Sequence, residues 1–300
     1  MAAGDPRAPA RAASGVSAGV SAGVSVCLPA RNEAPTIGAL VAEAVRLDLV
    51  SEVVVLDDGS TDDTAAIAGD AGARVVSEAS VLPEAGPGSG KGNAMWKSLY
   101  ACTGDVICWI DADLRNFRGE YIERLCAPLL AQPDTMFVKA YSTRSFEGAP
   151  TGGGRVTELV ARPLLSLLFP KLADIVQPLG GEYAARRRAL EVLPFVEGWG
   201  VELGLLVDVV ERFGRDAVAQ VDLEVREHRN RPLEDLGPQA LAVMATALRR
   251  AGLLPEATTP YVELLRAAPD GTIAARAVEV RERPPIITVP AYRARFSPPR

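Results

Sequence analysis

The stretch Val106-Ile-Cys-Trp-Ile-Asp-Ala-Asp113 decides the fold of this chain. Val106 to Ile110 is a short apolar run, which is typical of a buried strand, and two acids follow it directly. Asp111 and Asp113 therefore leave the end of the strand together. Mg²⁺ and Mn²⁺ take oxygen ligands and often bridge protein carboxylates to substrate phosphates. The stretch predicts a strand that ends at a site for a divalent cation, although acids follow strands often enough that its neighbours must support this interpretation.

The sequence before this stretch alternates between strand and helix patterns. The predicted strands are Val24 to Leu28, Val53 to Leu56 and Arg74 to Ser77, and the predicted helices are Pro35 to Arg46, Ser60 to Ala71 and Lys91 to Cys102. Ser60 and Asp63 have the spacing of a capping box. Such alternation predicts an α/β, Rossmann-like fold, with a mixed, mostly parallel sheet flanked by helices. The carboxyl ends of the strands then meet at one edge, where ligands bind in such folds.

The sequence after Asp113 is less regular. Predicted helices cover 118–130, 156–169, 201–213 and 238–251, with a kink at Pro163, and predicted strands cover 136–141 and 217–225. We expect a disordered Ala/Gly/Ser-rich tail over 1–23, a catalytic domain over 24–254 and a partly disordered, proline-containing extension over 255–300 that packs on the body or on a partner. The domain divides into a first half, 24–113, and a second half, 114–254.

Composition narrows the functional class. The 300 residues carry a net charge of −6, which argues against a nucleic-acid partner. No apolar run reaches the ~18 residues that a membrane span needs, and the first residues lack the apolar block of a signal peptide. The four cysteines form no CxxC pair, and Cys27 and Cys108 lie in apolar runs. We therefore expect reduced thiols, a cytoplasmic location and no membrane partner.

Polar segments follow the first two strands. Pro29-Ala-Arg-Asn-Glu33 ends the first, although Asn32 would also suit a helix cap. Leu56-Asp-Asp-Gly-Ser60 ends the second. The helix dipole explains acids at the start of the next helix, but it does not explain Asp57 and Asp58, which precede the glycine. Their carboxylates are suited to accept hydrogen bonds from a nucleobase edge or from ribose hydroxyls.

A glycine-rich segment, Gly86-Pro-Gly-Ser-Gly-Lys-Gly-Asn93, resembles a phosphate loop only superficially. Asn93 stands where the GxxxxGK[ST] pattern needs Ser or Thr, and no strand directly precedes the loop, so an ATPase is rejected. The loop is still suited to present Lys91 to a diphosphate.

Three later segments suggest an anion and acceptor site. Gly152-Gly-Gly-Arg155 precedes a predicted helix, where free amides and a guanidinium suit a phosphate or carboxylate, although a flexible surface loop is the simpler alternative. Glu202 follows Gly198-Trp-Gly200 at the start of an apolar helix, either as a first-turn acid or as a group that orients an acceptor hydroxyl. His228 is the only histidine and lies in a basic turn, which suits a metal and phosphate site, although a lone histidine is usually structural.

Together these segments resemble a known family. PARNE, LDDGSTDDT, GSGKGNAMW and DAD are similar to GT-A glycosyltransferases in general, and GGGRVTELVARPLL, QPLGGEYAARR, GWGVELGLL and HRNRPL resemble the GT81 group of retaining hexosyl-3-phosphoglycerate synthases. The resemblance runs from about Val26 to Gly252. It implies that 24–113 is the nucleotide-sugar-binding half and 114–254 the acceptor-binding half. It implies a GT-A fold, a homodimer, Mg²⁺ or Mn²⁺ as cofactor, and transfer of glucose from UDP-glucose to the 2-hydroxyl of D-3-phosphoglycerate with retention.

The resemblance also implies the roles of particular residues. The donor-binding residues would be Pro29, Asn32, Glu33, Asp58, Lys91, Asp111 and Ala112. The acceptor-binding residues would be Gly154, Arg155, Thr157 and Asn230. Asp113 and His228 would bind the metal with the donor diphosphate, and Glu202, Asp113 and Lys91 would be catalytic. The family pattern has serine at the positions of Asp58 and Ala112, which leaves the choice between uracil and guanine open.

Three alternatives remain at this point. A mannosyl-3-phosphoglycerate synthase using GDP-mannose would share the same motifs. A polyprenyl-phosphate sugar transferase would share the first four but would need a lipid acceptor. A sugar-nucleotide sensor without turnover would have no use for DAD, Glu202 and His228. The apolar helices between Val156 and Phe213 offer a dimer interface.

Overall fold

The computed structural model describes residues 23–146, 149–152, 154–226, 232–255 and 259–296. Within them, an eight-stranded mixed sheet has the order β3-β2-β1-β4-β7-β5-β6, and β9 also pairs with β5. Its strands are β1 (Val24–Ala30), β2 (Val50–Asp57), β3 (Arg74–Ser77), β4 (Val106–Trp109), β5 (Phe137–Phe146), β6 (Ala149–Gly152), β7 (Tyr183–Arg186) and β9 (Val218–Arg226). The predicted α/β fold with a mixed sheet flanked by helices is confirmed.

The direction of pairing divides the sheet into two parts. β3, β2, β1 and β4 are parallel to one another, with Ala30 opposite Asp57 and Cys27 opposite Trp109. β7 then runs antiparallel to both β4 and β5, whereas β9 is parallel to β5. The carboxyl ends of β1, β2 and β4 consequently meet at one edge of the sheet.

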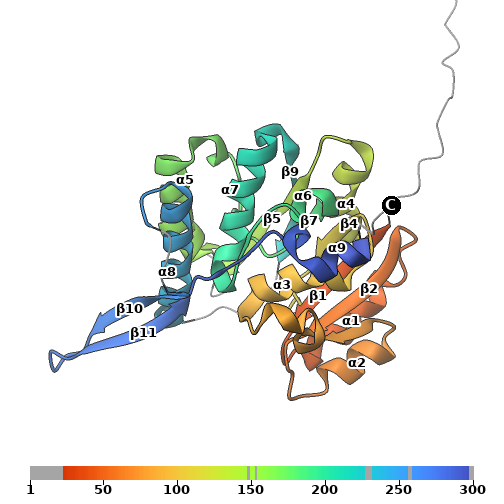
Figure 1. Ribbon diagram of the computed structural model, residues 1–300, viewed down its shortest axis with the longest axis horizontal. Coiled ribbons are helices and arrows are strands. Elements are labelled where there is room, and N and C mark those ends of the chain that lie inside the picture. The colour runs from red at the N-terminus through yellow and green to blue at the C-terminus, as the bar shows by residue number, and fades with distance from the viewer. Residues whose placement is uncertain (1–22, 147–148, 153, 227–231, 256–258, 297–300) are drawn as a thin grey trace, which may run out of the picture.

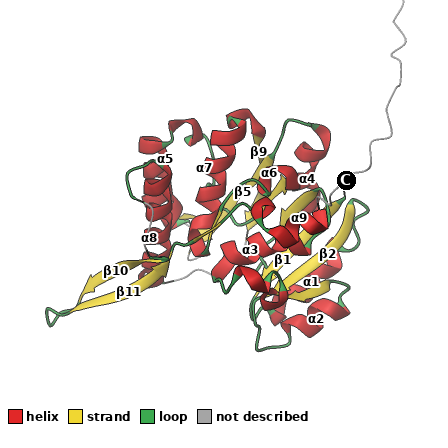
Figure 2. Ribbon diagram, in the orientation of Figure 1, coloured by secondary structure: helices red, strands yellow, loops and turns green. Residues whose placement is uncertain are grey.

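Helices cover both faces of the sheet (Figures 1 and 2). They are α1 (Ala34–Ala44), α2 (Thr64–Asp70), α3 (Gly90–Ala101), α4 (Glu120–Ala131), α5 (Arg162–Leu168), α6 (Arg187–Leu190), α7 (Val201–Phe213), α8 (Leu233–Arg250) and α9 (Pro290–Phe296). Because side chains alternate along a strand, Val26 and Leu28 of β1 pack in the core under α1 and α4, and Cys27 packs in the core under α3 and α7. Full burial of one such large apolar side chain contributes about 1.5–3 kcal/mol.

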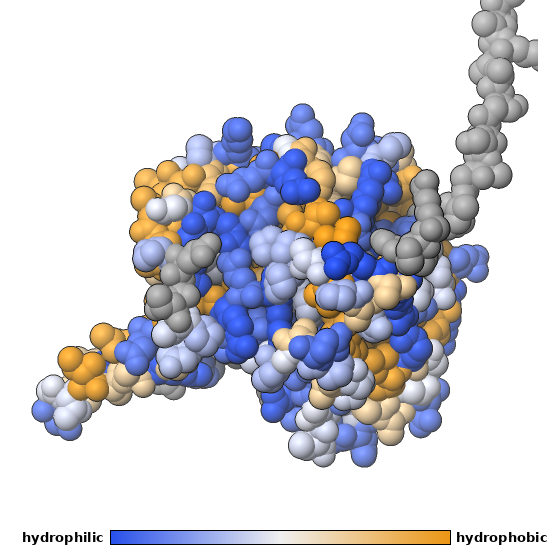
Figure 3. Space-filling model, viewed as in Figure 1, coloured by the Kyte–Doolittle hydropathy of each residue, from blue (hydrophilic) through white to orange (hydrophobic). Residues whose placement is uncertain are grey.

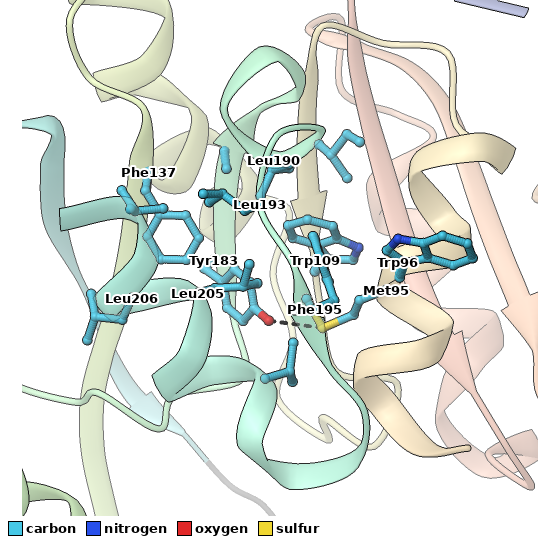
Figure 4. Packing of buried hydrophobic residues seen from close by; sticks show 14 of the residues in the cluster. Met95, Trp96, Trp109, Phe137, Tyr183, Leu190, Leu193, Phe195, Leu205 and Leu206 are labelled. Atoms are coloured by element: carbon cyan, nitrogen blue, oxygen red, sulfur yellow. Dashed lines mark hydrogen bonds between the residues drawn. The ribbon is translucent and has the colours of Figure 1, made fainter. Parts of the chain in front are cut away.

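Aromatic side chains fill the core under α3 and α7 (Figure 4). The rings of Trp109 and Tyr183 lie 5.3 Å apart, and both side chains are fully buried. The Tyr183 hydroxyl donates to the sulfur of Met95, and the Trp109 indole N–H donates to Ser98 Oγ. Every polar atom of this aromatic cluster therefore has a partner, as burial requires. The cluster fixes β4 and β7 against α3, which carries Lys91.

One local prediction is wrong, and another is confirmed with a local irregularity. α2 begins at Thr64, with Asp63 as its N-cap and no side-chain cap, so the predicted capping box does not form. Ser60 Oγ instead accepts a hydrogen bond from the Asn32 backbone N–H, because the loops after β1 and β2 are adjacent. The predicted helix 156–169 is confirmed, since the backbone is helical without a break over 155–168. Its first part is a π-helical turn, η3 (Thr157–Ala161), which continues into α5, and Pro163 lies in the first turn of α5.

The segment after Leu254 is more regular than its prolines suggested. β10 (Tyr261–Ala267) and β11 (Ile273–Glu279) form a hairpin that projects from the body (Figure 1). β12 (Glu282–Arg283) pairs with β8 (Phe195–Val196), and a 3₁₀ turn, η7 (Ile286–Thr288), leads into α9. α9 packs on the body, where the buried Tyr292 accepts a hydrogen bond from Arg187. The domain boundaries themselves stay a prediction, and the predicted tail lies almost wholly outside the described residues.

Two further expectations concern the cysteines and the membrane. All four cysteines are free and buried, as expected of reduced thiols. Over the described parts of the chain, no helix combines the length and the apolar character needed to cross a membrane.

Candidate active site

A pocket of about 450 Å³ lies at the carboxyl ends of β1, β2 and β4. Its volume is within the range of small-molecule sites. Its lining consists of Pro29, Ala30, Arg31, Glu33, Asp58, Gly90, Lys91, Ala94, Asp111, Ala112, Asp113, Gly154, Arg155, Val156, Thr157, Leu179, Gly181, Trp199, Glu202, Leu236 and Gln239. The pocket thus joins residues of both halves of the chain, and it is strongly polar.

Lys91 connects the two halves within the pocket. Its Nζ lies 2.5 Å from Asp111 Oδ1 and 3.1 Å from Glu202 Oε1. Burial by itself lowers the pKa of Lys91, but the carboxylates of Asp111 and Glu202 oppose it and raise the pKa above its ordinary value. Lys91 is therefore a cation throughout the physiological range, and it cannot act as a general base there. Its charge suits a phosphate that enters the pocket.

Close packing fixes Asp111. Gly181, which lies just before β7, is so close to Asp111 that a Cβ on it would be 2.0 Å from Asp111 Oδ2. Only glycine leaves room for this carboxylate. On the other side of the turn, Thr36 Oγ1 at the start of α1 donates a 2.6 Å hydrogen bond to the Ala112 carbonyl. The Asp-Ala-Asp turn is consequently held from two elements that are distant in sequence.

The loops after β1 and β2 form the opposite part of the donor side. Asn32 has a left-handed backbone (φ 57°), and its side-chain oxygen accepts a 2.8 Å hydrogen bond from Thr61 N. Asp58 is half-buried, and its carboxylate lies 3.7 Å from Arg31. Burial, together with the nearby carboxylate of Glu78, raises the pKa of Asp58. A half-buried acid at this position is suited to accept hydrogen bonds from a nucleobase or a ribose.

Helix starts of the second half form the remaining wall. Gly154 has a positive φ of 75°, and Arg155 and Thr157 follow it at the turn into η3. Glu202 lies in the first turn of α7 and is 8% exposed. Trp199 precedes it, whereas Leu236 and Gln239 come from α8. The Arg155 guanidinium and the backbone amides near it suit an anion. The Glu202 carboxylate, three residues after Trp199, adds an acidic group to the same wall.

Most of the predicted site residues meet in this pocket. Among the described ones, Asn32 and Asp57 are not in its lining. The Asn32 side-chain oxygen accepts a hydrogen bond from Thr61 N, and the Asp57 carboxylate accepts one from Ser60 N, so both side chains hold the loop after β2. His228 and Asn230 lie outside the described residues. Four further lining residues were not predicted individually: Leu179, Gly181, Leu236 and Gln239. The glycine pair before Glu182 was a signal for Gly181, but Leu236 and Gln239 belong to an ordinary amphipathic helix and carry no signal of their own.

The donor set suits a hard divalent cation. Among the described residues, no group of three or more His, Cys, Asp or Glu side chains is arranged to hold a metal. Mg²⁺ and Mn²⁺ bound with a nucleotide diphosphate need only one or two protein carboxylates, since phosphate oxygens and water complete the coordination. Asp113 lies in the pocket lining beside the Asp111–Lys91 pair. The carboxylate chemistry of this site therefore fits such an ion.

The GT-A-like sheet, the strand-end carboxylates and the pocket together define a glycosyltransferase. In agreement, the sequence pattern of Glycosyl transferase family 2 matches residues 25–191. Glucosyl-3-phosphoglycerate synthase of Petrotoga mobilis is 42% identical over 287 residues, which cover 91% of this chain and 88% of the relative. The synthase of Mycolicibacterium paratuberculosis is 46% identical over 273 residues, which cover 87% and 83%.

Solved structures give the same result. Glucosyl-3-phosphoglycerate synthase from Mycobacterium tuberculosis in complex with Mn²⁺, UDP-glucose and phosphoglyceric acid matches with a TM-score of 0.79 and 46% identity, over 89% of this chain and 90% of that one. A complex of the same enzyme with Mg²⁺ and UDP matches with a TM-score of 0.79 at 45% identity, over 89% and 91%. This chain belongs to glycosyl transferase family 2 and, within it, to the family of the glucosyl-3-phosphoglycerate synthases.

Proposed function

We propose that this chain transfers glucose from UDP-glucose to the 2-hydroxyl of D-3-phosphoglycerate, with retention of the α configuration. The observation that carries the proposal is that Asp113, Lys91, Arg155 and Glu202 line one pocket, in which Lys91 pairs with Glu202. The match to relatives that bear this activity in their names, and to structures that hold both substrates, supports it.

Each side of the pocket has its own substrate in this proposal. The donor nucleotide contacts Pro29, Glu33, Asp58 and Asp111, with Ala112 beside them and Asn32 supporting the loop. The phosphate or carboxylate of the acceptor binds at Gly154, Arg155 and Thr157, where the guanidinium can donate two parallel hydrogen bonds. Asn230 joins this acceptor group in the proposal on the strength of the sequence alone.

Asp113, together with His228, would hold Mg²⁺ or Mn²⁺ against the donor diphosphate. Such an ion would supply positive charge to stabilise the diphosphate leaving group. Lys91 contributes in the same direction, since its cation is positioned before the reaction and needs no rearrangement.

We propose a displacement on one face of the sugar. The bond from C1 of glucose to the β-phosphate oxygen breaks, and a bond from C1 to the acceptor 2-hydroxyl oxygen forms on the same face. The hydroxyl proton passes to the departing phosphate oxygen. Glu202, held by Lys91 at 3.1 Å, orients the glucose and the acceptor hydroxyl. A covalent sugar adduct on any Asp or Glu of the chain would exclude this mechanism.

A panel of donors tests the proposed function. The purified chain is incubated with D-3-phosphoglycerate, Mg²⁺ or Mn²⁺, and either UDP-glucose, GDP-glucose or GDP-mannose, and the anomeric proton of the product is observed by NMR. We expect an α-glucosyl product from UDP-glucose. An α-mannosyl product from GDP-mannose would change the sugar and the nucleotide in the proposal. If no donor gives a product, D-3-phosphoglycerate is not the acceptor.

We also propose that the chain works as a cytoplasmic homodimer. Free, buried thiols support a reducing compartment. Exposed leucines support a self-association surface: Leu167 of α5 is 79% exposed and Leu159 of η3 is 73% exposed, and hydrophobic residues gather over α5 in Figure 3. Light scattering of the purified chain and of its Leu159→Ser, Leu167→Ser variant tests the dimer, and cell fractionation tests the compartment.

A further inference from the structure

The glycine-rich loop that precedes Lys91 is held by a segment almost 200 residues later in the chain. Arg283 of β12 donates to the carbonyls of Ala85 (2.7 Å) and Gly86 (3.1 Å). Its neighbour Arg281 donates to the carbonyl of Pro87 at 3.2 Å. The loop lies so close to Arg283 that a Cβ on Gly88 would be 2.2 Å from its Nη2. Three consecutive loop carbonyls thus end on two guanidinium groups of the C-terminal extension.

A buried carboxylate completes this arrangement. Glu197, which is fully buried, lies 2.7 Å from Arg283 Nε and accepts a 3.0 Å hydrogen bond from Ser89 N. Burial raises the pKa of Glu197, whereas the Ser89 N–H and the Arg283 guanidinium oppose this effect. Ser89 is the N-cap of α3, and Gly90 and Lys91 come directly after it. The carboxylate therefore fixes the start of the helix that carries the pocket lysine.

The same carboxylate is close to the other wall of the pocket. Glu197 directly precedes Gly198-Trp-Gly200, which leads into α7 and Glu202. The contact is tight, because a Cβ on Gly92 would lie 1.9 Å from the Val196 carbonyl oxygen. β12 pairs with β8 on the far side, with Arg283 opposite Phe195. The glycine-rich loop before Lys91, the start of α7 and the C-terminal extension consequently meet at one buried ion pair, Arg283–Glu197.

We propose that Arg283 and Glu197 are positioning residues, which set Lys91 against Glu202 by fixing the glycine-rich loop, and that the C-terminal extension is thereby part of the machinery of the donor site. Neither side chain lines the pocket, so both act through the loop. The proposal uses the donor role of Lys91, so it rests on the donor side of the proposed function and not on the identity of the acceptor. It gives a function to the C-terminal extension, although the extension lies outside all the sequence motifs of the site.

The test compares Arg283→Met with a matched control. Arg249→Ala removes a 2.7 Å hydrogen bond to the Val280 carbonyl, so it loosens the same extension without touching the loop. Hydrogen exchange of the protein alone reports on residues 84–92, and calorimetry with UDP and Mn²⁺ reports on the donor site. We expect Arg283→Met to speed exchange in the loop at least about 10-fold and to weaken UDP binding about 10-fold or more, with Arg249→Ala close to wild type.

Kinetics then separate positioning from stability. A positioning role predicts a higher donor KM and a lower kcat for Arg283→Met at a temperature where it is fully folded, with the acceptor KM changed less than threefold. Equal loop exchange and equal UDP affinity in Arg283→Met and wild type would overturn the proposal. So would the same changes in Arg249→Ala, because the effect would then belong to the extension as a whole.

A second variant covers the case in which Arg283→Met does not fold. Arg283→Lys keeps a charge beside Glu197 but cannot reach several carbonyls at once, and we expect faster loop exchange and an intermediate UDP affinity. Wild-type loop exchange in this variant would contradict the proposal. The exchange measurement needs no substrate, so a wild-type protein that fails to glucosylate 3-phosphoglycerate would refute the proposed function and leave this inference standing.

Discussion

The two halves of the sheet place their functional residues by different means. In the half formed by β3, β2, β1 and β4, parallel strands end at one edge, and Asp58, Asp111 and Asp113 follow strand ends directly. In the half formed by β7, β5 and β9, pairing is mixed, and the pocket residues come from helix starts, from α8 and from the loop before β7. A parallel sheet gives its ligand edge by geometry, whereas the second half depends on how its helices pack.

Asp113→Ala, in the parallel half of the sheet, should cause the largest loss of activity. We expect kcat/KM to fall by about 10³-fold, because the carboxylate at the strand end no longer supports the charge of the diphosphate. Mn²⁺-dependent binding of UDP should weaken as well. Steady-state kinetics and calorimetry measure both quantities. Asp63→Ala, which changes the exposed N-cap of α2, is the control and should retain nearly full activity. Full activity of Asp113→Ala would remove the metal assignment.

Lys91→Met would break the contact between the halves. It removes the cation between Asp111 and Glu202, and we expect kcat to fall by about 10²- to 10³-fold. Because the folded pKa of Lys91 is raised, its stabilising contribution is complete below the ordinary value of 10.5 and is lost as the pH rises through the folded pKa.

Thermal unfolding of wild type and Lys91→Met over a pH series checks the second part of this prediction. The difference in stability between the two proteins should stay constant from pH 7 to 9.5 and shrink only at higher pH. A difference that already disappears near pH 8 would show that Lys91 is not held as a cation.

Arg155→Ala, in the second half, should weaken acceptor binding selectively. Loss of a charge-assisted hydrogen bond of about 1.5–3 kcal/mol predicts a rise of about 10- to 100-fold in the acceptor KM, with little change in the donor KM. Arg162→Ala is the matched control, since Arg162 of α5 pairs with Glu158 on the surface. Initial-rate kinetics with each substrate varied in turn decide the matter, and an unchanged acceptor KM for Arg155→Ala would refute the anion site.

Gly181→Ala sharpens the comparison, because it changes a residue of the second half that acts on the first. The added Cβ would lie 2.0 Å from Asp111 Oδ2, so the carboxylate must move. We expect UDP affinity to fall about 10-fold, with a loss of about 1–3 kcal/mol in stability. Calorimetry and denaturant unfolding measure the two effects. Gly69→Ala in α2, where a Cβ meets nothing closer than 3.9 Å, should leave UDP affinity unchanged and should not lower stability.

Glu52→Gln should have the smallest effect on activity, because it lies at the amino edge of the same parallel strands. Glu52 accepts hydrogen bonds from Ser25 and from Thr103, and it pairs with Arg74. Burial opposes ionisation, but these partners lower the pKa of Glu52 to about 2. Its stabilising contribution is therefore present above the ordinary value of 4.5 and is lost as the pH falls toward 2.

We expect Glu52→Gln to cost about 1–2 kcal/mol at pH 7, to cost little near pH 2, and to leave kcat/KM unchanged. Denaturant unfolding at several pH values checks this expectation. A fall in kcat/KM at full folding would mean that the two edges of the sheet are coupled.

The sequence by itself determined the fold class and the donor edge. The apolar run before Asp111 and its alternation with helices fix a sheet with helices on both faces, because strand and helix periods are local properties of the chain. Strand-end acids then meet without further information. Local patterns also located Lys91, Arg155 and Glu202, although not the distances between them.

Only the tertiary structure decided how these residues meet. The approach of Gly181 to Asp111 and the positions of Leu236 and Gln239 depend on packing between elements far apart in sequence. The same holds for the Arg283–Glu197 pair, which brings the C-terminal extension to the donor loop. Ser60 did not cap α2, and its Oγ instead accepts a hydrogen bond from the Asn32 backbone N–H in the adjacent loop after β1. Local patterns set which elements form, but contacts across the fold set the final position of each side chain.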